Sequence, residues 1–325
     1  MTRREVLAGA AGVIFFARRP SPQARLRSTA SARQVAEAPF VIPPGATDCH
    51  THVFGDPKTF PFAEGRTYTP GPAPVEEMQA LHRSLQLQRV VVVQPSVYGT
   101  DNACTLDAIR RLGSRARGIA VIGDGTSDAD LDRMDRAGIR GIRVNLETAG
   151  QTDPAIGRQR FEAATRRVAR RRWHVQVFAR LSVIAAIADG VAAAPVPVVF
   201  DHFGGAQGPL GVEQPGFDAL LTLVRTGKAY VKISAPYRGS TQPPDYPDMA
   251  PLARALIAAN PQRILWGSDW PHPNTSPAAP RTPEGTAPRI PVDDPHVLSL
   301  FASWAPDHSV RRTILVDNPA ALYRF

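Results

Sequence analysis

The sequence contains little cysteine, little lysine and no apolar run long enough to cross a membrane. Its two cysteines, Cys49 and Cys104, could form one bridge at most, so a disulfide framework is excluded. The apolar run near the N-terminus, Val6 to Ala17, spans about 12 residues, whereas a bilayer needs about 20. Apolar residues as a whole are plentiful, at 43% of 325, which suffices for a large core and excludes a disordered chain or a collagen.

The basic charge is concentrated at one end of the chain. The formal net charge is +9, and only three of the 38 basic residues are lysines. Residues 1–33 contain seven arginines and one acidic residue, so they carry +6 and leave only +3 for the rest. A pI near 10.2 is typical of nucleic-acid-binding proteins. Because the excess lies in the first tenth of the chain, we expect no nucleic-acid partner.

The basic N-terminal segment has the order of an export signal. Arg3 and Arg4 precede the short apolar run, and Ala30-Ser31-Ala32 follows it as a cleavage-type site. The segment Thr-Arg-Arg-Glu-Val-Leu resembles the twin-arginine type. We therefore expect residues 1–32 to be a signal, residues 33–325 to form the mature domain, and the protein to be exported or periplasmic without stable membrane association. An uncleaved basic tail on a cytoplasmic protein is the alternative.

Eight short apolar segments read as strands buried on both faces, since they are β-branched and nearly continuous. They are Ala46–Val53, Arg89–Gln94, Gly118–Ile122, Gly141–Leu146, His174–Phe178, Val196–Asp201, Tyr230–Ser234 and Arg263–Gly267.

Helical patterns of period 3.6 alternate with these strands. They cover Val75–Leu87, Ala103–Leu112, Asp128–Ala137, Phe161–Arg172, Ser182–Ala193, Phe217–Arg225, Met249–Ala259 and Val297–Trp304. Eight βα units in succession predict a single-domain α/β fold, the (β/α)₈ TIM barrel, with a doubly wound sheet as the alternative. Two long loops, Asp56–Pro74 and Trp270–Pro291, follow the first and last strands, where barrel active sites are built.

Polar residues gather where the predicted strands end. His50 and His52 stand two apart at the end of the first strand, so both should face the barrel interior. His202 follows the sixth strand and Asp269 the eighth. Imidazoles and a carboxylate at one barrel mouth can bind a metal ion, or can polarise a carbonyl beside a general base. His82, His296 and His308 are expected on the surface, and His174 is either structural or part of the site.

These motifs occur in a fixed order along the chain. They are Asp48-Cys49-His50-Thr51-His52-Val53-Phe54-Gly55, Tyr68-Thr69-Pro70, Val93-Gln94-Pro95-Ser96 with Tyr98, Gly141-Ile142-Arg143, Asp201-His202, Val231-Lys232-Ile233-Ser234 with Tyr237-Arg238, and Gly267-Ser268-Asp269-Trp270-Pro271-His272. With them the chain resembles the amidohydrolase-related family of TIM-barrel hydrolases, especially the branch of 2-pyrone-4,6-dicarboxylate lactonase and the sugar-acid and muconolactone lactonases.

The resemblance implies a role for each site residue. Asp269 would be the general base, and His50, His52 and His202 would polarise a lactone carbonyl. Anionic and ring groups of a small substrate would be bound by a further set: Tyr68, Tyr98, Arg143, Arg238 and His272.

The resemblance leaves the cofactor open. Binuclear relatives use a carboxylated lysine at the end of the fourth strand, where this chain has none. In one form of the site a single divalent ion, zinc if present, is bound by His50, His52 and Asp269, with His202 as a less certain ligand. In the other form the site contains no metal.

A lactone hydrolase acting on a small carboxylated substrate is the function expected from these features. A metal-dependent decarboxylase of the same family is the first alternative. A catalytically silent periplasmic sugar-acid binding protein is the second, although such a protein has no chemical need for three histidines beside Asp269.

Overall fold

The computed structural model describes residues 40–275 and 285–325. The predicted signal at residues 1–32 lies outside the described residues, as does part of the loop 270–291. No helix within the described ranges is both long and apolar enough to span a membrane.

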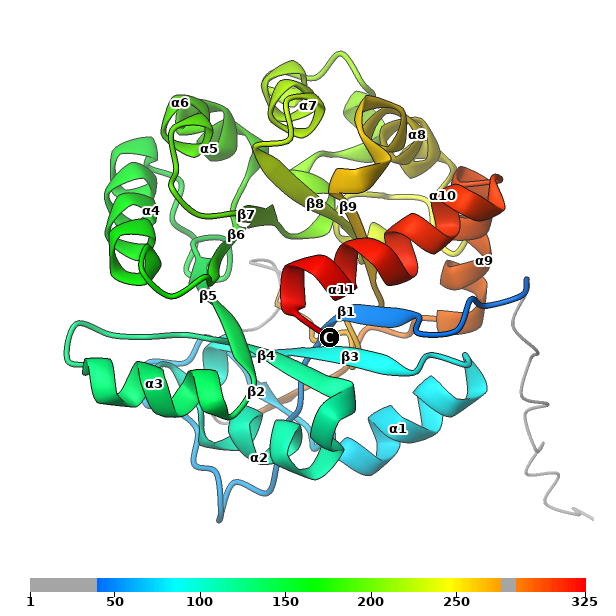
Figure 1. Cartoon of the computed structure of the whole chain (residues 1–325). Coiled ribbons are helices and arrows are strands. Elements are labelled where there is room, and N and C mark those ends of the chain that lie inside the picture. The colour runs from blue at the N-terminus through cyan, green and yellow to red at the C-terminus, as the bar shows by residue number, and fades with distance from the viewer. Residues whose placement is uncertain (1–39, 276–284) are drawn as a thin grey trace, which may run out of the picture. The chain divides into compact units, whose positions relative to one another are not determined.

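Eight parallel strands form a nearly closed barrel, as predicted (Figure 1). In spatial order they are β1 (Thr47–Thr51), β3 (Arg89–Val93), β4 (Ala116–Ala120), β5 (Ile139–Asn145), β6 (His174–Phe178), β7 (Val198–Phe200), β8 (Ala229–Ser234) and β9 (Ile264–Gly267). The spatial order equals the sequence order, which is the pattern produced by repeated right-handed βα units. The two-stranded pair β2 (Thr69–Pro70) and β10 (Thr286–Ala287) joins the two long loops to each other.

The seam of the barrel closes between β1 and β9. The backbone N–H of Asp269 donates to the carbonyl of His50 at 2.9 Å, and that of His52 donates to Trp270 at 2.7 Å. Asp48, fully buried on β1, accepts hydrogen bonds from the backbone N–H and the hydroxyl of Ser268 at 3.0 and 2.6 Å. These bonds set His50 and Asp269 side by side.

Helices cover the outside of the strands (Figure 1). They are α1 (Val75–Ser84), α2 (Ala103–Leu112), α3 (Asp128–Arg136), α4 (Pro154–Val168), α5 (Leu181–Ala186), α6 (Ala188–Ala192), α7 (Phe217–Arg225), α8 (Ala250–Ala259) and α9 (Asp294–Trp304). Helix α4 begins seven residues before the predicted Phe161, because the Asp153 side chain caps the N–H of Ala155 and Pro154 suits the first turn. The predicted helix Ser182–Ala193 is divided at Ile187, and its first part begins at Leu181.

The C-terminal residues form elements that were not predicted. α10 (His308–Arg312), a π-helical turn (Thr313–Asp317) and α11 (Asn318–Tyr323) follow one another. Leu322 and Tyr323 of α11 pack with inward-facing apolar residues of the strands, among them Cys49, Val91 and Leu265. This cluster fills the barrel interior, so chemistry is left to the opposite end, where β1, β7 and β9 present polar side chains.

Candidate active site

Three histidines and one aspartate converge at the C-terminal ends of β1, β7 and β9. Their side chains are almost fully buried. The Nε2 atoms of His50, His52 and His202 lie 3.5, 3.4 and 3.9 Å from one oxygen of Asp269, Oδ1. His202 and Asp269 have left-handed backbones, with φ of 47° and 64°. Such a conformation costs free energy at a residue with a side chain and is typical of functional sites.

Asp269 has one engaged oxygen and one open oxygen. Oδ2 accepts hydrogen bonds from the hydroxyl of Tyr237 at 2.6 Å and from Arg238 Nε at 2.9 Å, and Arg238 Nη2 lies 2.8 Å away. Oδ1 is buried and has no hydrogen-bond partner among the described residues. Burial opposes ionisation, but the charge of Arg238 holds the pKa of Asp269 well below its usual range. The carboxylate is therefore ionised at neutral pH, with Oδ1 available.

Each histidine is held through its other ring nitrogen, Nδ1. His52 Nδ1 lies 2.8 Å from the carbonyl oxygen of Val93, and His202 Nδ1 lies 2.8 Å from the hydroxyl of Ser234. His50 Nδ1 lies 3.2 Å from Lys232 Nζ. Burial, followed by the charge of Lys232, lowers the pKa of His50 to about 3, and burial lowers that of His202 well below its usual value. Both rings are neutral at physiological pH.

The donor atoms are placed as a small metal site requires. His50 Nε2, His202 Nε2 and Asp269 Oδ1 lie within 4.8 Å of one another, and all three are buried without a hydrogen-bond partner in the described part of the chain. Two imidazoles and a carboxylate suit zinc. In this group His202 takes the place that the sequence analysis gave to His52.

A small cavity of about 10 Å³ lies among Asp269, His52 and His202, and Tyr68 and Arg143 line it as well. This volume is about that of a single water molecule. Burial raises the pKa of Tyr68 to about 12, so its hydroxyl keeps its proton. Arg143 donates through Nε to Asp201 at 3.1 Å, and its guanidinium lies over the Phe178 ring.

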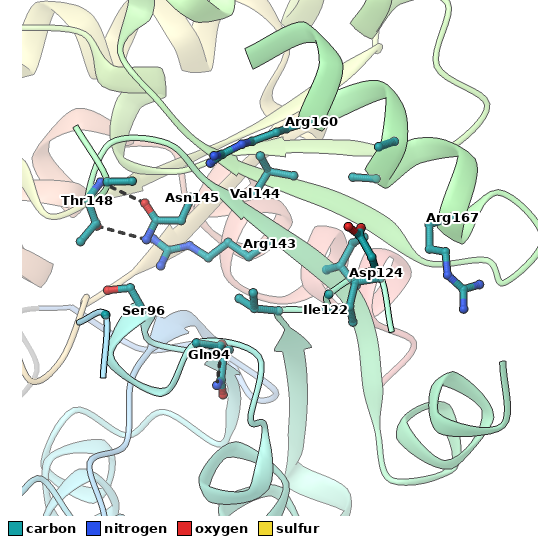
Figure 2. A pocket seen from close by; sticks show the side chains of 18 of the residues that line it. Gln94, Ser96, Ile122, Asp124, Arg143, Val144, Asn145, Thr148, Arg160 and Arg167 are labelled. Atoms are coloured by element: carbon teal, nitrogen blue, oxygen red, sulfur yellow. Dashed lines mark hydrogen bonds between the residues drawn. The ribbon is translucent and has the colours of Figure 1, made fainter. Parts of the chain in front are cut away.

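A much larger cavity, of about 870 Å³, adjoins the small one and shares Ser96, Arg143 and Thr148 with it. Helix α4 contributes Arg160 to its wall, and Figure 2 shows that side chain extending toward the end where Asn145 and Thr148 lie. Arg160 forms no ion pair or hydrogen bond with any described residue. A further cavity of about 570 Å³ meets the site at His202 and Arg238, on the side of α5.

Not every residue predicted for the site lies against these cavities. The Tyr98 hydroxyl accepts a hydrogen bond from the backbone of Gly55 at 3.0 Å, and His272 Nε2 lies 3.1 Å from Asp294, behind Tyr237. Arg238 lines the small cavity, but its guanidinium is engaged with Asp269, Thr275 and Pro273. Arg238 therefore fixes the position of the Asp269 carboxylate. Substrate binding by Arg238, Tyr98 and His272 stays a prediction.

Sequence reasoning missed Tyr237, Lys232 and Gln176, which hold the site from behind. Lys232 is fully buried on β8 and donates to Gln176 at 2.8 Å. A lysine inside an apolar strand segment was the available signal, because an unpaired lysine is rarely buried. The surface position expected for His82 is wrong: it is 7% exposed, and its Nε2 lies 3.1 Å from Asp48.

The chain is similar to known proteins over most of its length. Residues 47–325 match the family described as amidohydrolase. The 4-sulfomuconolactone hydrolase of Hydrogenophaga intermedia is 34% identical over 287 residues, which are 87% of this chain and 90% of that protein. The 2-pyrone-4,6-dicarboxylate hydrolase of Comamonas testosteroni is 35% identical over 293 residues, 87% of this chain and 92% of that one.

A solved structure has the same fold. It is that of an Acinetobacter baumannii protein named as a 2-pyrone-4,6-dicarboxylic acid hydrolase, with citric acid bound. Its TM-score is 0.72 at 26% identity, and the match covers 86% of this chain and 100% of that chain.

Proposed function

This chain belongs to the amidohydrolase family, and on that premise we propose that it hydrolyses the ring ester of a small lactone that carries an anionic substituent. The observation that carries the proposal is the arrangement around Asp269, whose unbonded Oδ1 lies 3.4 to 3.9 Å from the Nε2 atoms of three histidines, beside a cavity of about one water molecule. Two relatives of more than 30% identity are named as hydrolases of lactones or pyrones, which supports the same reaction class.

Asp269 would activate the attacking water. Its Oδ2 is fixed by Tyr237 and Arg238, so only Oδ1 can receive a proton. A backbone carbonyl only accepts hydrogen bonds, so His52 donates from Nδ1 to Val93 and keeps a lone pair on Nε2. Oδ1 and this Nε2 are 3.4 Å apart, and both residues line the small cavity, so a water molecule in that cavity can donate to either acceptor.

The carbonyl of the lactone would be polarised by hydrogen-bond donors beside that water. Attack forms a tetrahedral intermediate whose oxygen becomes negative, and buried donors stabilise this charge more than water does. His202 lines the small cavity, and the His50 ring packs against that of His202 with centroids 4.6 Å apart. The ring oxygen leaves as the hydroxyl of the opened product when the proton is returned to it. The product gains a carboxylate, so each turnover releases one acid equivalent near neutral pH.

A divalent metal ion would serve the same carbonyl by another means. His50, His202 and Asp269 would hold it, since their free atoms converge, and it would supply Lewis-acid polarisation.

The anionic substituent would be bound by arginine. Only the Nε of Arg143 is engaged with a described carboxylate, which leaves its outer edge toward the cavities, and Arg160 has no partner among the described residues. A guanidinium fork matches a carboxylate or a sulfonate. The names of the relatives contain a dicarboxylate and a sulfonate, and the Acinetobacter baumannii structure holds citric acid, all of them anionic.

A lactone panel tests the proposal. Purified protein is given monocyclic lactones and pyrones, with and without carboxylate substituents, and acid release is followed by pH-stat together with carbon dioxide evolution. We expect one acid equivalent per turnover, no carbon dioxide, and higher kcat/KM for carboxylated members. Stoichiometric carbon dioxide would instead identify a decarboxylase, and tight binding of sugar acids with no turnover of any lactone would identify a binding protein.

A further inference from the structure

Lys232 is a buried cation that the hydrolytic steps above do not use. It lies on β8 and is completely inaccessible to solvent. Its Nζ is 2.8 Å from Gln176 Oε1, 3.2 Å from His50 Nδ1 and 3.3 Å from Asp201 Oδ1. Burying an ammonium group is costly unless it is fully paired, so its position behind one catalytic imidazole needs a reason.

The neighbours of Lys232 are oriented so that its N–H groups have fixed targets. Gln176 donates its amide Nε2 to Asp201 Oδ2 at 3.0 Å, which turns its Oε1 toward Lys232. Arg143 donates to the same Oδ2. Asp201 Oδ1 lies 3.2 Å from His50 Nδ1, but it has no hydrogen bond of acceptable geometry with any described residue. The aligned partner of His50 Nδ1 is therefore Lys232.

This contact determines which nitrogen of His50 carries the proton. An ammonium group has three donors and no acceptor, so the nitrogen that faces it must accept. A neutral imidazole that accepts at Nδ1 carries its proton at Nε2, the atom that lies 3.5 Å from Asp269 Oδ1. His52 has the opposite arrangement, because its Nδ1 faces a carbonyl oxygen.

We propose that Lys232 is a positioning residue that holds His50 in the Nε2–H tautomer, which makes His50 the donor to the substrate carbonyl oxygen. His52 and Asp269 are then the acceptors that hold the water. This assignment rests on the proposed hydrolysis of a lactone and deepens it, because it gives two histidines of one short motif opposite roles.

The same contact opposes metal binding through His50, since a protonated Nε2 has no lone pair to offer. Without the Lys232 ammonium, His50 could donate Nδ1–H to Asp201 Oδ1, only 3.2 Å away. Its Nε2 lone pair would then face His202 and Asp269, completing the group of three ligands. The residue behind the ring thus selects between the two means of polarising the carbonyl.

Nitrogen NMR of the wild-type protein tests the tautomer directly. With ¹⁵N-histidine, long-range ¹H–¹⁵N spectra at pH 7 distinguish a protonated from an unprotonated ring nitrogen, and a His50→Asn variant assigns the signals. We expect proton-bearing Nε2 and bare Nδ1 for His50, and the reverse for His52. Proton-bearing Nδ1 in His50, or metal coordination of its Nε2 in the purified enzyme, would overturn the proposal.

A Lys232→Met variant provides the second test. It should bind Zn²⁺ or Co²⁺ about 10- to 100-fold more tightly than wild type, the size of effect typical of residues that orient metal ligands. Its kcat for the preferred lactone should fall at least about tenfold with little change in KM. Ser234→Ala, which removes the Nδ1 partner of His202 instead, should shift the NMR signals of His202 and leave the tautomer of His50 unchanged.

The outcomes separate the two proposals. Unchanged or weaker metal affinity in a folded Lys232→Met protein contradicts the role of Lys232. If no lactone is turned over while His50 shows the Nε2–H tautomer, the tautomer assignment stands and the proposed reaction fails. If the variant does not fold, the wild-type spectrum still decides.

Discussion

Replacing Asp269 with asparagine is the sharpest test of the hydrolytic mechanism. Tyr237 and Arg238 both donate to Oδ2, so the amide oxygen of the new side chain must take that position. The amide nitrogen is then forced into the position of Oδ1, where it donates to the lone pair of His52 Nε2. The substitution therefore keeps the shape of the site and replaces the base by a hydrogen-bond donor.

The expected loss follows from the role of the removed group. A positioned general base contributes about 10²- to 10⁴-fold to a rate, or about 3–5 kcal/mol of barrier. We expect kcat of Asp269→Asn to fall by that factor, while the affinity for the ring-opened product changes by less than about tenfold, because Arg143 and the large cavity are untouched. Initial rates by pH-stat and product titration by calorimetry measure the two quantities.

Stability must be measured beside activity, since the variant leaves the Arg238 charge with a neutral partner. Losing one member of a buried ion pair costs about 3–5 kcal/mol, so the thermal midpoint should drop while the folded fraction at assay temperature stays high. Asp135→Asn is a matched control, because this carboxylate bonds Trp173 and Arg324 at the other end of the barrel. Should a folded Asp269→Asn enzyme keep kcat within tenfold of wild type, the base is another group and the mechanism is wrong.

Three further outcomes are expected. Arg160→Gln should lower kcat/KM about tenfold for lactones with a remote carboxylate and leave uncharged lactones unaffected, whereas Arg158→Gln, on the same helix outside the cavity, should change neither. Asp48→Ala should lower the free energy of unfolding in urea by about 3–5 kcal/mol, since it leaves buried donors of Ser268 unpaired. A loss below about 1 kcal/mol would contradict the inference that Asp48 holds β1 and β9 together. Burial lowers the pKa of His174 from 6.5 to about 3, so the unfolded chain binds the extra proton between those values and stability falls as pH drops through that window. Between pH 7 and 5 the free energy of unfolding of His174→Phe should therefore fall by about 2 kcal/mol less than that of the wild type. Equal falls would show that His174 is not buried in its neutral form.

The barrel could be predicted because buried parallel strands leave a plain mark in sequence. Val90–Val93 and Val196–Phe200 are apolar on both faces, and His50 and His52 stand out by ending such a segment. The C-terminal helices could not be predicted in this way, because α10 and α11 are short and are positioned by Leu322 and Tyr323, which fill the barrel. The export signal at residues 1–32 stays a prediction.

Individual roles in the site were harder to predict than its location. Arg238 was expected to bind substrate, and nothing in its neighbourhood along the chain indicates that its partner is Asp269, 31 residues away. His82 was expected at the surface because it lies on a polar helix, yet the buried Asp48 on β1 requires a partner there. In both cases the deciding contact is made by folding, and sequence patterns report faces of elements rather than pairs of residues.

The balance of buried charge gives an independent reason to expect an anionic substrate. Three cations of the network, Lys232, Arg143 and Arg238, face two carboxylates, Asp201 and Asp269, and burial keeps His50 and His202 neutral. The network thus carries one uncompensated positive charge in a place that water reaches poorly. A bound carboxylate would neutralise it in the ground state, and the developing oxyanion of the tetrahedral intermediate would interact with the same cations as the reaction proceeds. An uncharged lactone uses only the second of these interactions, so it should be hydrolysed with a higher KM than its carboxylated analogue, and kcat should differ less than KM.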